Sequence, residues 1–256
     1  MKTERFEIRN RHGLKLIIAV DRVENQKGLA VIAHGHGSNM NFPLIRDISI
    51  PFLSKFFTVV RFDTTNTDNQ SEGKYENGTP TTYYQDLEDV MEWVKDQDFY
   101  EKPILAGQSI GGMSVADYAI KNQTKVKSII LVSPSVSGEL SMANKPIDLL
   151  LKWKKDGFYT RPSTAFEGLT RKYPWSYAED VMKKSILKYA ENFVIPVLTI
   201  AGEKDTATPP QHQTLFYWKL KCPKEFHIIS DADHDFNGDE VREKLQYLIS
   251  QWVDKI

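Results

Sequence analysis

Short apolar runs alternate with longer amphipathic stretches along most of the chain. The apolar runs are rich in Val, Ile and Leu and are bounded by turn residues, which is typical of buried strands. The predicted strands are Arg5–Arg9, Lys15–Val20, Leu29–Ala33, Phe57–Phe62, Ile104–Ala106, Ser128–Val132, Val194–Ile200 and Glu225–Ile229. Between them, stretches such as Thr82–Val94 and Val241–Val253 repeat apolar residues at helical spacing. This alternation predicts an α/β fold, with an eight-stranded, mostly parallel sheet covered by helices on both faces.

The pentapeptide Gly-Gln-Ser-Ile-Gly at 107–111 lies between a predicted strand and a predicted helix. A G-x-S-x-G pattern in that setting is typical of a nucleophile elbow, a tight turn that lifts the serine Oγ clear of the sheet edge. The flanking glycines leave room for the helix to pack close to the strand. We therefore predict that Ser109 is a catalytic nucleophile, and an ordinary turn serine is the alternative.

A serine hydroxyl becomes a good nucleophile only beside a base, which a third group must orient. Asp205 follows the strand Val194–Ile200, and His234 follows the strand Glu225–Ile229. Both therefore lie on loops at the edge where parallel strands end, in the chain order serine, acid, histidine that an elbow requires. We predict Asp205 as the acid and His234 as the base. Capping of a helix near Pro209 is the alternative role for Asp205.

The strand Leu29–Ala33 runs directly into His34-Gly35-His36-Gly37. A loop in this place supplies one backbone N–H to an oxyanion hole, and the residue after the nucleophile supplies the other. We therefore expect the N–H groups of His36 and Ile110 to form the oxyanion hole. His34 is expected to make a structural hydrogen bond.

Three aspartates surround the predicted base: Asp231, Asp233 and Asp235. Together with His36 they suggest a metal site, but their spacing matches no standard zinc or calcium pattern, so no metal is expected. Asp233 and Asp235 are also the nearest substitutes for Asp205 as the acid. Of the other histidines, His227 lies within a predicted strand and is expected in the core.

These motifs resemble those of the α/β-hydrolase superfamily, and the resemblance covers nearly the whole chain. Within the superfamily the chain is most similar to small bacterial serine esterases that include feruloyl and cinnamoyl esterases. This closer likeness rests on Arg61-Phe62-Asp63, on Ser71–Asn77 and on Gly202-Glu203-Lys204-Asp205. The resemblance implies an α/β-hydrolase fold and an acyl-transferring serine.

The chain departs from that family in three places. Gln108 precedes the nucleophile where many relatives have histidine, and His36 stands where many have a hydrophobic or aromatic residue. The segment between the sixth and seventh predicted strands is also particular to this chain. These departures leave the predicted triad intact but change the expected choice of substrate. Gln108 is therefore a further candidate for substrate contact.

Residues 136–192, which we call the cap segment, interrupt the alternation of strands and helices. The segment shows no strand pattern, is far longer than an ordinary connection, and has an excess of Lys and Arg. We expect a helical cap inserted between two parts of one core, residues 1–135 and 193–256. The aromatic residues that we expect among the pocket walls are Trp153, Phe158, Tyr159, Phe166, Tyr173 and Trp175. A peripheral insertion whose aromatics only pack on the core is the alternative.

Bulk composition fits a small enzyme without nucleic-acid or membrane partners. The chain has 256 residues and a formal net charge of −1, with both signs interspersed. Cys222 is the sole cysteine, so no internal disulfide is expected. The first residues contain no apolar leader pattern, which favours a cytoplasmic location. Composition indicates nothing about the oligomeric state.

Two classes of function remain open from the sequence. The first is a carboxylic-ester hydrolase that acts on aromatic or short acyl esters through an acyl-enzyme and needs no cofactor. Thioesterases, peptidases and acyltransferases use the same residue types, so they remain alternatives within this class. The second class is a non-catalytic binding protein of the same fold, which the four catalytic elements argue against.

Overall fold

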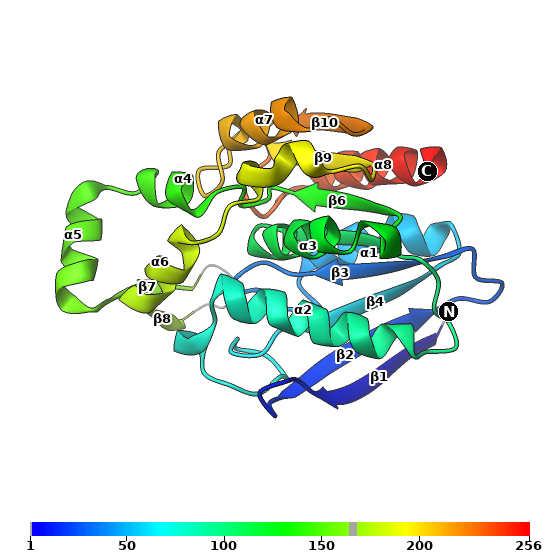
Figure 1. The fold of residues 1–256 in the computed structure, drawn as a ribbon, viewed down its shortest axis with the longest axis horizontal. Coiled ribbons are helices and arrows are strands. Elements are labelled where there is room, and N and C mark those ends of the chain that lie inside the picture. The colour runs from blue at the N-terminus through cyan, green and yellow to red at the C-terminus, as the bar shows by residue number, and fades with distance from the viewer. Residues whose placement is uncertain (1, 164–167) are drawn as a thin grey trace.

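The computed structural model describes residues 2–163 and 168–256, and its centre is one twisted sheet (Figure 1). In spatial order, the eight described strands of this sheet are β1 (Lys2–Arg9), β2 (Lys15–Arg22), β4 (Phe57–Asp63), β3 (Gly28–Ala33), β5 (Ile104–Gln108), β6 (Ser128–Val132), β9 (Val197–Gly202) and β10 (Lys224–Ile229). β2 runs antiparallel to both of its neighbours, and the other pairs are parallel. The predicted mostly parallel sheet is confirmed.

Helices cover both faces of the sheet, as predicted. On one face, α2 (Pro80–Lys95), α3 (Ile110–Lys121) and α7 (Pro210–Lys219) pack against one buried apolar cluster. On the other face, α1 (Pro43–Ser54) and α8 (Asp239–Lys255) pack against a second cluster. Successive strand residues point to opposite faces, so the continuous apolar runs that predicted the strands supply both clusters.

The predicted strand at Val194–Ile200 begins later than expected. Val194 is 71% exposed, and β9 starts only at Val197. Pro196 precedes that start and has no N–H to donate to a neighbouring strand, so the apolar stretch cannot pair from its beginning. The carboxyl end of β9 is unaffected and leads into the Asp205 loop.

The cap segment leaves the sheet after β6 and returns before β9 (Figure 1). Its helical elements are α4 (Gly138–Ala143), α5 (Ile147–Asp156), α6 (Trp175–Met182) and the short 3₁₀ stretch η3 (Ile186–Asn192). Between α5 and α6, β7 (Phe158–Pro162) and β8 (Thr170–Pro174) form an antiparallel hairpin. The expectation that this segment contains no strand is therefore wrong. The two strands are short and carry Arg, Lys and Thr among their aromatics, which conceals their pattern.

The loops that carry the predicted site residues all lie at one edge of the sheet. The parallel strands β3, β5, β9 and β10 all end at this edge, and their following loops carry the predicted site residues. Within the described residues, no helix combines the length and the apolar character needed to cross a membrane.

Candidate active site

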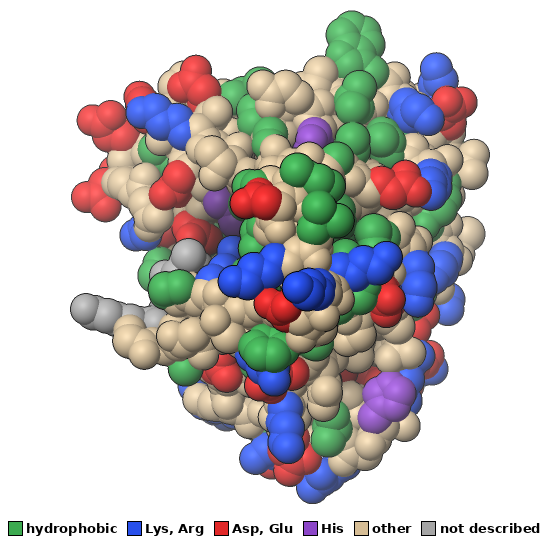
Figure 2. Space-filling view, turned by 90° about the vertical axis from the view of Figure 1, so that its left-hand side faces the viewer, with side chains coloured by type: hydrophobic (Ala, Val, Ile, Leu, Met, Phe, Trp, Pro, Cys, Tyr) green, Lys and Arg blue, Asp and Glu red, His purple; other side chains and the backbone are tan. Residues whose placement is uncertain are grey.

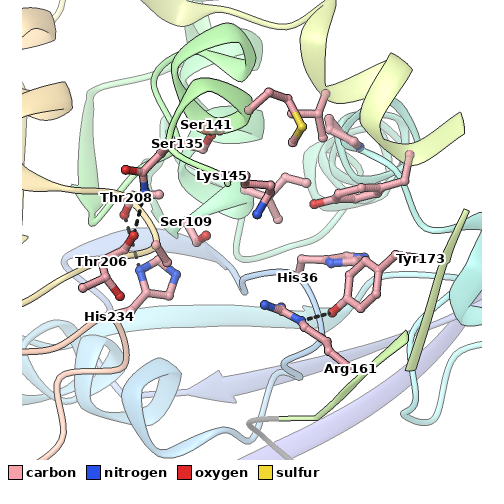
Figure 3. A pocket seen from close by; sticks show the side chains of 18 of the residues that line it. His36, Ser109, Ser135, Ser141, Lys145, Arg161, Tyr173, Thr206, Thr208 and His234 are labelled. Atoms are coloured by element: carbon pink, nitrogen blue, oxygen red, sulfur yellow. Dashed lines mark hydrogen bonds between the residues drawn. The ribbon is translucent and has the colours of Figure 1, made fainter. Parts of the chain in front are cut away.

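Ser109 occupies the sharp turn that joins β5 to α3. Its backbone has φ 55° and ψ −120°, a strained combination that residues with a side chain rarely adopt. The N–H of Ser109 donates to the Val132 carbonyl (3.0 Å), and its own carbonyl accepts from the Ser135 N–H (3.1 Å). Strand β6 and the residues after it therefore hold the strained turn, and Ser109 borders the cavity beneath the cap segment (Figure 3).

The buried Asp205 and the partly exposed His234 form a hydrogen-bonded pair at the same edge. The Nδ1–H of His234 donates to Asp205 Oδ2 at 2.8 Å. The other oxygen of Asp205 accepts from the backbone N–H groups of Ala207 (2.8 Å) and Thr208 (2.9 Å), which fixes the carboxylate in its loop. The first helical turn of α7 has no side-chain cap, so capping is not the role of Asp205.

Thr208 completes the surroundings of this pair. Its hydroxyl lies 2.8 Å from Asp205 Oδ2 and 3.0 Å from the carbonyl oxygen of Ser133. The hydroxyl has one proton to share between these two acceptors. Together with the backbone donors, it leaves the carboxylate fully hydrogen-bonded despite its burial, and the carboxylate in turn orients the His234 ring.

The pKa values of the pair shift in the directions expected for an ion pair. Burial alone would raise the pKa of Asp205, but the hydrogen bond and the charge of His234 bring it below its ordinary value. Burial likewise disfavours protonated His234, but the bond to Asp205 and the surrounding aspartate charges raise the pKa of this histidine. The pair is thus built to stabilise an imidazolium, which is the charge that a general base acquires.

Gln108 contacts the free nitrogen of the same imidazole. Its Nε2 donates to His234 Nε2 at 3.1 Å and to the His234 carbonyl at 3.3 Å. Among the described residues, this amide and not the Ser109 hydroxyl is hydrogen-bonded to His234 Nε2. Sequence analysis identified Gln108 as a substrate contact and missed this interaction, which depends on two loops that meet only in the folded chain.

The loop after β3 packs directly against the elbow. A Cβ on Gly35 would lie 1.9 Å from Gln108 Oε1 and 3.3 Å from the Cβ of Ser109, so a side chain there would displace the Gln108 amide and crowd the nucleophile. The buried His34 ring fixes this loop, because its Nδ1 donates to the Gly35 carbonyl (2.8 Å) and its Nε2 accepts from the Thr64 N–H (3.1 Å). This is the structural role expected for His34.

The two residues predicted to form an oxyanion hole come from different loops that meet at the cavity. Ile110 is the first residue of α3, where N–H groups have no partner within the helix. His36 lies in the turn closed by the bond from the Ser38 N–H to the Gly35 carbonyl (3.1 Å). Both residues line the cavity that Ser109 faces.

The side chain of His36 is held in a cluster of tyrosines. Its ring stacks on Tyr177 with a centroid separation of 4.8 Å, and its Nδ1 lies 3.1 Å from the Tyr75 hydroxyl. Burial, followed by the charges of Arg161 and Arg171, lowers the pKa of His36 to about 3. The imidazole is therefore neutral and acts as part of an aromatic wall.

A cavity of about 410 Å³ separates the elbow from the cap segment (Figure 3). Ser109, Gln108 and His234 line its core side. Three of the predicted wall residues line its cap side: Trp153, Tyr159 and Tyr173. The sequence analysis missed Tyr177, Lys145 and Arg161, which line the same side. The cap segment thus forms a wall of the cavity, and the alternative of a purely peripheral insertion is wrong.

The remaining predicted wall residues are not brought to the cavity. Phe158 is 42% exposed and packs under the Lys172 ammonium, because its neighbour Tyr159 takes the inward face of β7. Trp175 packs edge-on against Trp153 at 5.5 Å, behind the wall. Phe166 lies outside the described residues.

Two of the three aspartates around His234 have partners of their own. Asp231 pairs with Lys204, and Asp233 accepts from the backbone and side chain of Asn237. Asp235 borders the cavity. None of the three replaces Asp205 at the imidazole Nδ1. His227, expected in the core, lies on the edge strand β10 with its side chain 37% exposed, because an edge strand is covered less completely.

Comparisons with known proteins agree with this architecture. A family model described as the alpha/beta hydrolase fold matches residues 31–172. The uncharacterized protein YfhR of Escherichia coli (strain K12) is 24% identical over 233 residues, which cover 87% of this chain and 70% of that protein. The abhydrolase domain-containing protein abhd-5.2 of Caenorhabditis elegans is 29% identical over 104 residues, 41% of this chain, and the match spans only 22% of that relative.

Solved structures show the same fold over the whole chain. Est1E from Butyrivibrio proteoclasticus, in a structure with ferulic acid bound, aligns over 98% of both chains with a TM-score of 0.84 and 22% identity. The shared architecture therefore includes the cap segment as well as the sheet. Because the family model matches more than half of the sequence, the chain belongs to the α/β hydrolase fold family.

Proposed function

We propose that the protein is a serine hydrolase that cleaves carboxylic esters through a triad of Ser109, His234 and Asp205. One observation carries the proposal. A serine in a strained turn and an aspartate-bound imidazole border the same cavity, although they come from loops far apart in the sequence. A purely structural turn would need neither the strain nor the imidazole held by Asp205.

Acylation would begin when His234 Nε2 takes the proton from the Ser109 hydroxyl as its oxygen attacks the ester carbonyl. In the structure, the Gln108 amide donates a hydrogen bond to that nitrogen. The imidazole therefore has to exchange this bond for one to Ser109 when substrate binds, and catalytic hydrogen bonds commonly tighten at that stage. Asp205 keeps the proton on Nδ1 and stabilises the imidazolium.

The oxyanion that develops on the carbonyl would be bound by the N–H groups of His36 and Ile110. Each such donor is typically worth about 3 kcal/mol of barrier. His234 then protonates the departing alkoxide, and the acyl group remains on Ser109. A water molecule, deprotonated by the same imidazole, attacks the acyl-enzyme and releases the acid.

The cavity supports small or aromatic esters as substrates. Its volume of about 410 Å³ suits a compact ligand, and Trp153, Tyr159 and Tyr173 present ring surfaces to it. The structural neighbour Est1E holds ferulic acid, an aromatic acid. Aromatic walls bind planar groups well, so an aryl or short acyl ester is the substrate that we propose.

Steady-state hydrolysis of p-nitrophenyl acetate by the protein and by Ser109→Ala tests this function. We expect the variant to lose essentially all enzyme-dependent turnover while its melting temperature changes little, because the substitution removes a single hydroxyl from the cavity wall. Equal turnover in the two proteins would refute the serine mechanism. A panel of thioester and peptide substrates then separates esterase from the other acyl-transfer activities.

A further inference from the structure

Two cationic side chains line the cap side of the cavity. Lys145 lies between α4 and α5, and Arg161 lies on β7. Two separate parts of the cap segment therefore place a cation at the same cavity. Figure 3 shows both side chains extending into the space that Ser109 and His234 border from the opposite side. Neither residue takes part in the acyl-transfer chemistry proposed above.

Neither cation has a carboxylate partner among the described residues. The Arg161 Nε donates to the Tyr173 hydroxyl at 3.1 Å, and the guanidinium lies 4.9 Å from the centroid of the same ring. The terminal Nη groups of Arg161 and the Nζ of Lys145 donate to no described residue. Of the described residues that line the cavity, Asp235 alone carries a carboxylate, and it forms no ion pair with either cation.

The hairpin places a like charge directly opposite Arg161. Arg161 and Arg171 face each other directly across β7 and β8, and like charges at such positions are destabilising. Arg171 is compensated by an ion pair with Asp68 at 2.9 Å. Arg161 has no such compensation.

Lys145 adds to this imbalance. Burial, and then the charge of Arg161, lower the pKa of Lys145. The cavity therefore holds two cationic side chains without a carboxylate partner among the described residues, and an anion placed between them would be attracted to both.

We propose that the substrate of this site is an anionic ester whose carboxylate is bound by Lys145 and Arg161. This inference rests on the proposed esterase function and adds the substrate class. Guanidinium and ammonium groups suit this role, because charge-assisted hydrogen bonds to a carboxylate are strong and the Arg fork can bind both oxygens. The tyrosines beside Arg161 contact the uncharged part of the substrate.

The outer surface is consistent with an anionic substrate. Figure 2 shows Lys and Arg side chains gathered across the face on which the cap segment lies. Within the cap segment, helix α5 carries three exposed lysines, Lys152, Lys154 and Lys155. A positive face near the cavity raises the local concentration of anions and hastens their arrival.

The test compares matched anionic and neutral esters. In one pair the charge lies on the acyl group: the p-nitrophenyl monoester of glutaric acid against p-nitrophenyl pentanoate. In the other it lies on the leaving group: p-carboxyphenyl butyrate against phenyl butyrate. We expect the anionic member of at least one pair to have the higher kcat/KM. Lys145→Gln and Arg161→Gln should each lower that anionic-to-neutral ratio about tenfold or more, as expected for loss of a charged hydrogen bond.

Lys152→Gln is the matched control, because it removes the same charge from the exposed face of α5, outside the cavity. It should leave the ratio unchanged. Ratios near one for both pairs, or ratios that Lys145→Gln and Arg161→Gln leave unaltered, would overturn the inference while the esterase function stands.

A binding measurement separates the two proposals. Titration calorimetry with glutarate should detect binding to the unaltered protein and to Lys152→Gln, and weaker binding to Arg161→Gln. If none of the four esters is hydrolysed, the esterase proposal fails, and the calorimetric result alone decides whether the cavity binds carboxylates. No glutarate binding together with no ester preference would refute the anion site.

Discussion

Replacement of Asp205 by asparagine isolates the role of the buried acid with almost no change in shape. The amide oxygen of asparagine can still accept from the Ala207 and Thr208 N–H groups, now bound at 2.8 and 2.9 Å. Its NH₂ group would then face His234 Nδ1, where a carboxylate oxygen now accepts a hydrogen bond from Nδ1–H at 2.8 Å. The imidazole must respond by carrying its proton on Nε2, the nitrogen that has to take the proton from Ser109.

The expected cost follows from this tautomer change. In a serine protease triad the same substitution lowers kcat about 10⁴-fold, which corresponds to about 5 kcal/mol of transition-state stabilisation. Stability should fall much less, by about 1–3 kcal/mol, because only the bond to His234 and the bond from the Thr208 hydroxyl change partners.

The assay is kcat on p-nitrophenyl acetate, with the thermal midpoint measured in parallel. Asp233→Asn and Asp235→Asn are the matched controls, because they remove the same charge next to the same histidine without touching its Nδ1. Each control should lose less than about tenfold in kcat, since it removes only a neighbouring charge. A crippling loss in either control, or near-normal kcat in Asp205→Asn, would refute the position of Asp205 as the triad acid.

Two further predictions concern the histidines. Because His36 is proposed to act through its backbone N–H, and its neutral ring packs among tyrosines, His36→Phe should keep kcat on p-nitrophenyl acetate within about tenfold. A loss as deep as that of His234→Ala would show that the His36 imidazole does chemistry. The aspartates raise the pKa of His234 above its ordinary 6.5, and only the neutral ring accepts a proton. The acidic limb of kcat/KM should therefore have its midpoint above pH 6.5, with activity rising as pH rises, and a midpoint below pH 6 would contradict the Asp205–His234 pairing.

Much of the fold could be read from the sequence because its signals are local. A parallel sheet is buried on both faces, so its strands are continuous apolar runs such as Leu29–Ala33. The elbow has a short signature, and the loops after later strands must lie at the same edge of the sheet. These rules suffice to bring Ser109, Asp205 and His234 to one edge.

The wall of the cavity could not be read in the same way. Phe158 and Tyr159 are adjacent aromatics, and which of them points inward depends on the pairing of β7 with β8. The two strands are short and partly polar, so the sequence pattern does not predict that they pair. Likewise, the bond between Gln108 and His234 joins residues 126 positions apart and leaves no local trace. That Arg161 has no carboxylate partner among the described residues, while the facing Arg171 pairs with Asp68, is also a property of the folded chain alone.

The central claim, that Ser109 is an activated nucleophile, is tested most directly by a fluorophosphonate probe followed by peptide mass spectrometry. The probe reacts with a serine only where a base and an oxyanion site activate it. The account predicts one probe per chain, attached to Ser109, with no labelling after the protein is unfolded beforehand. Absence of labelling in the folded protein, or attachment to a different serine, would contradict it.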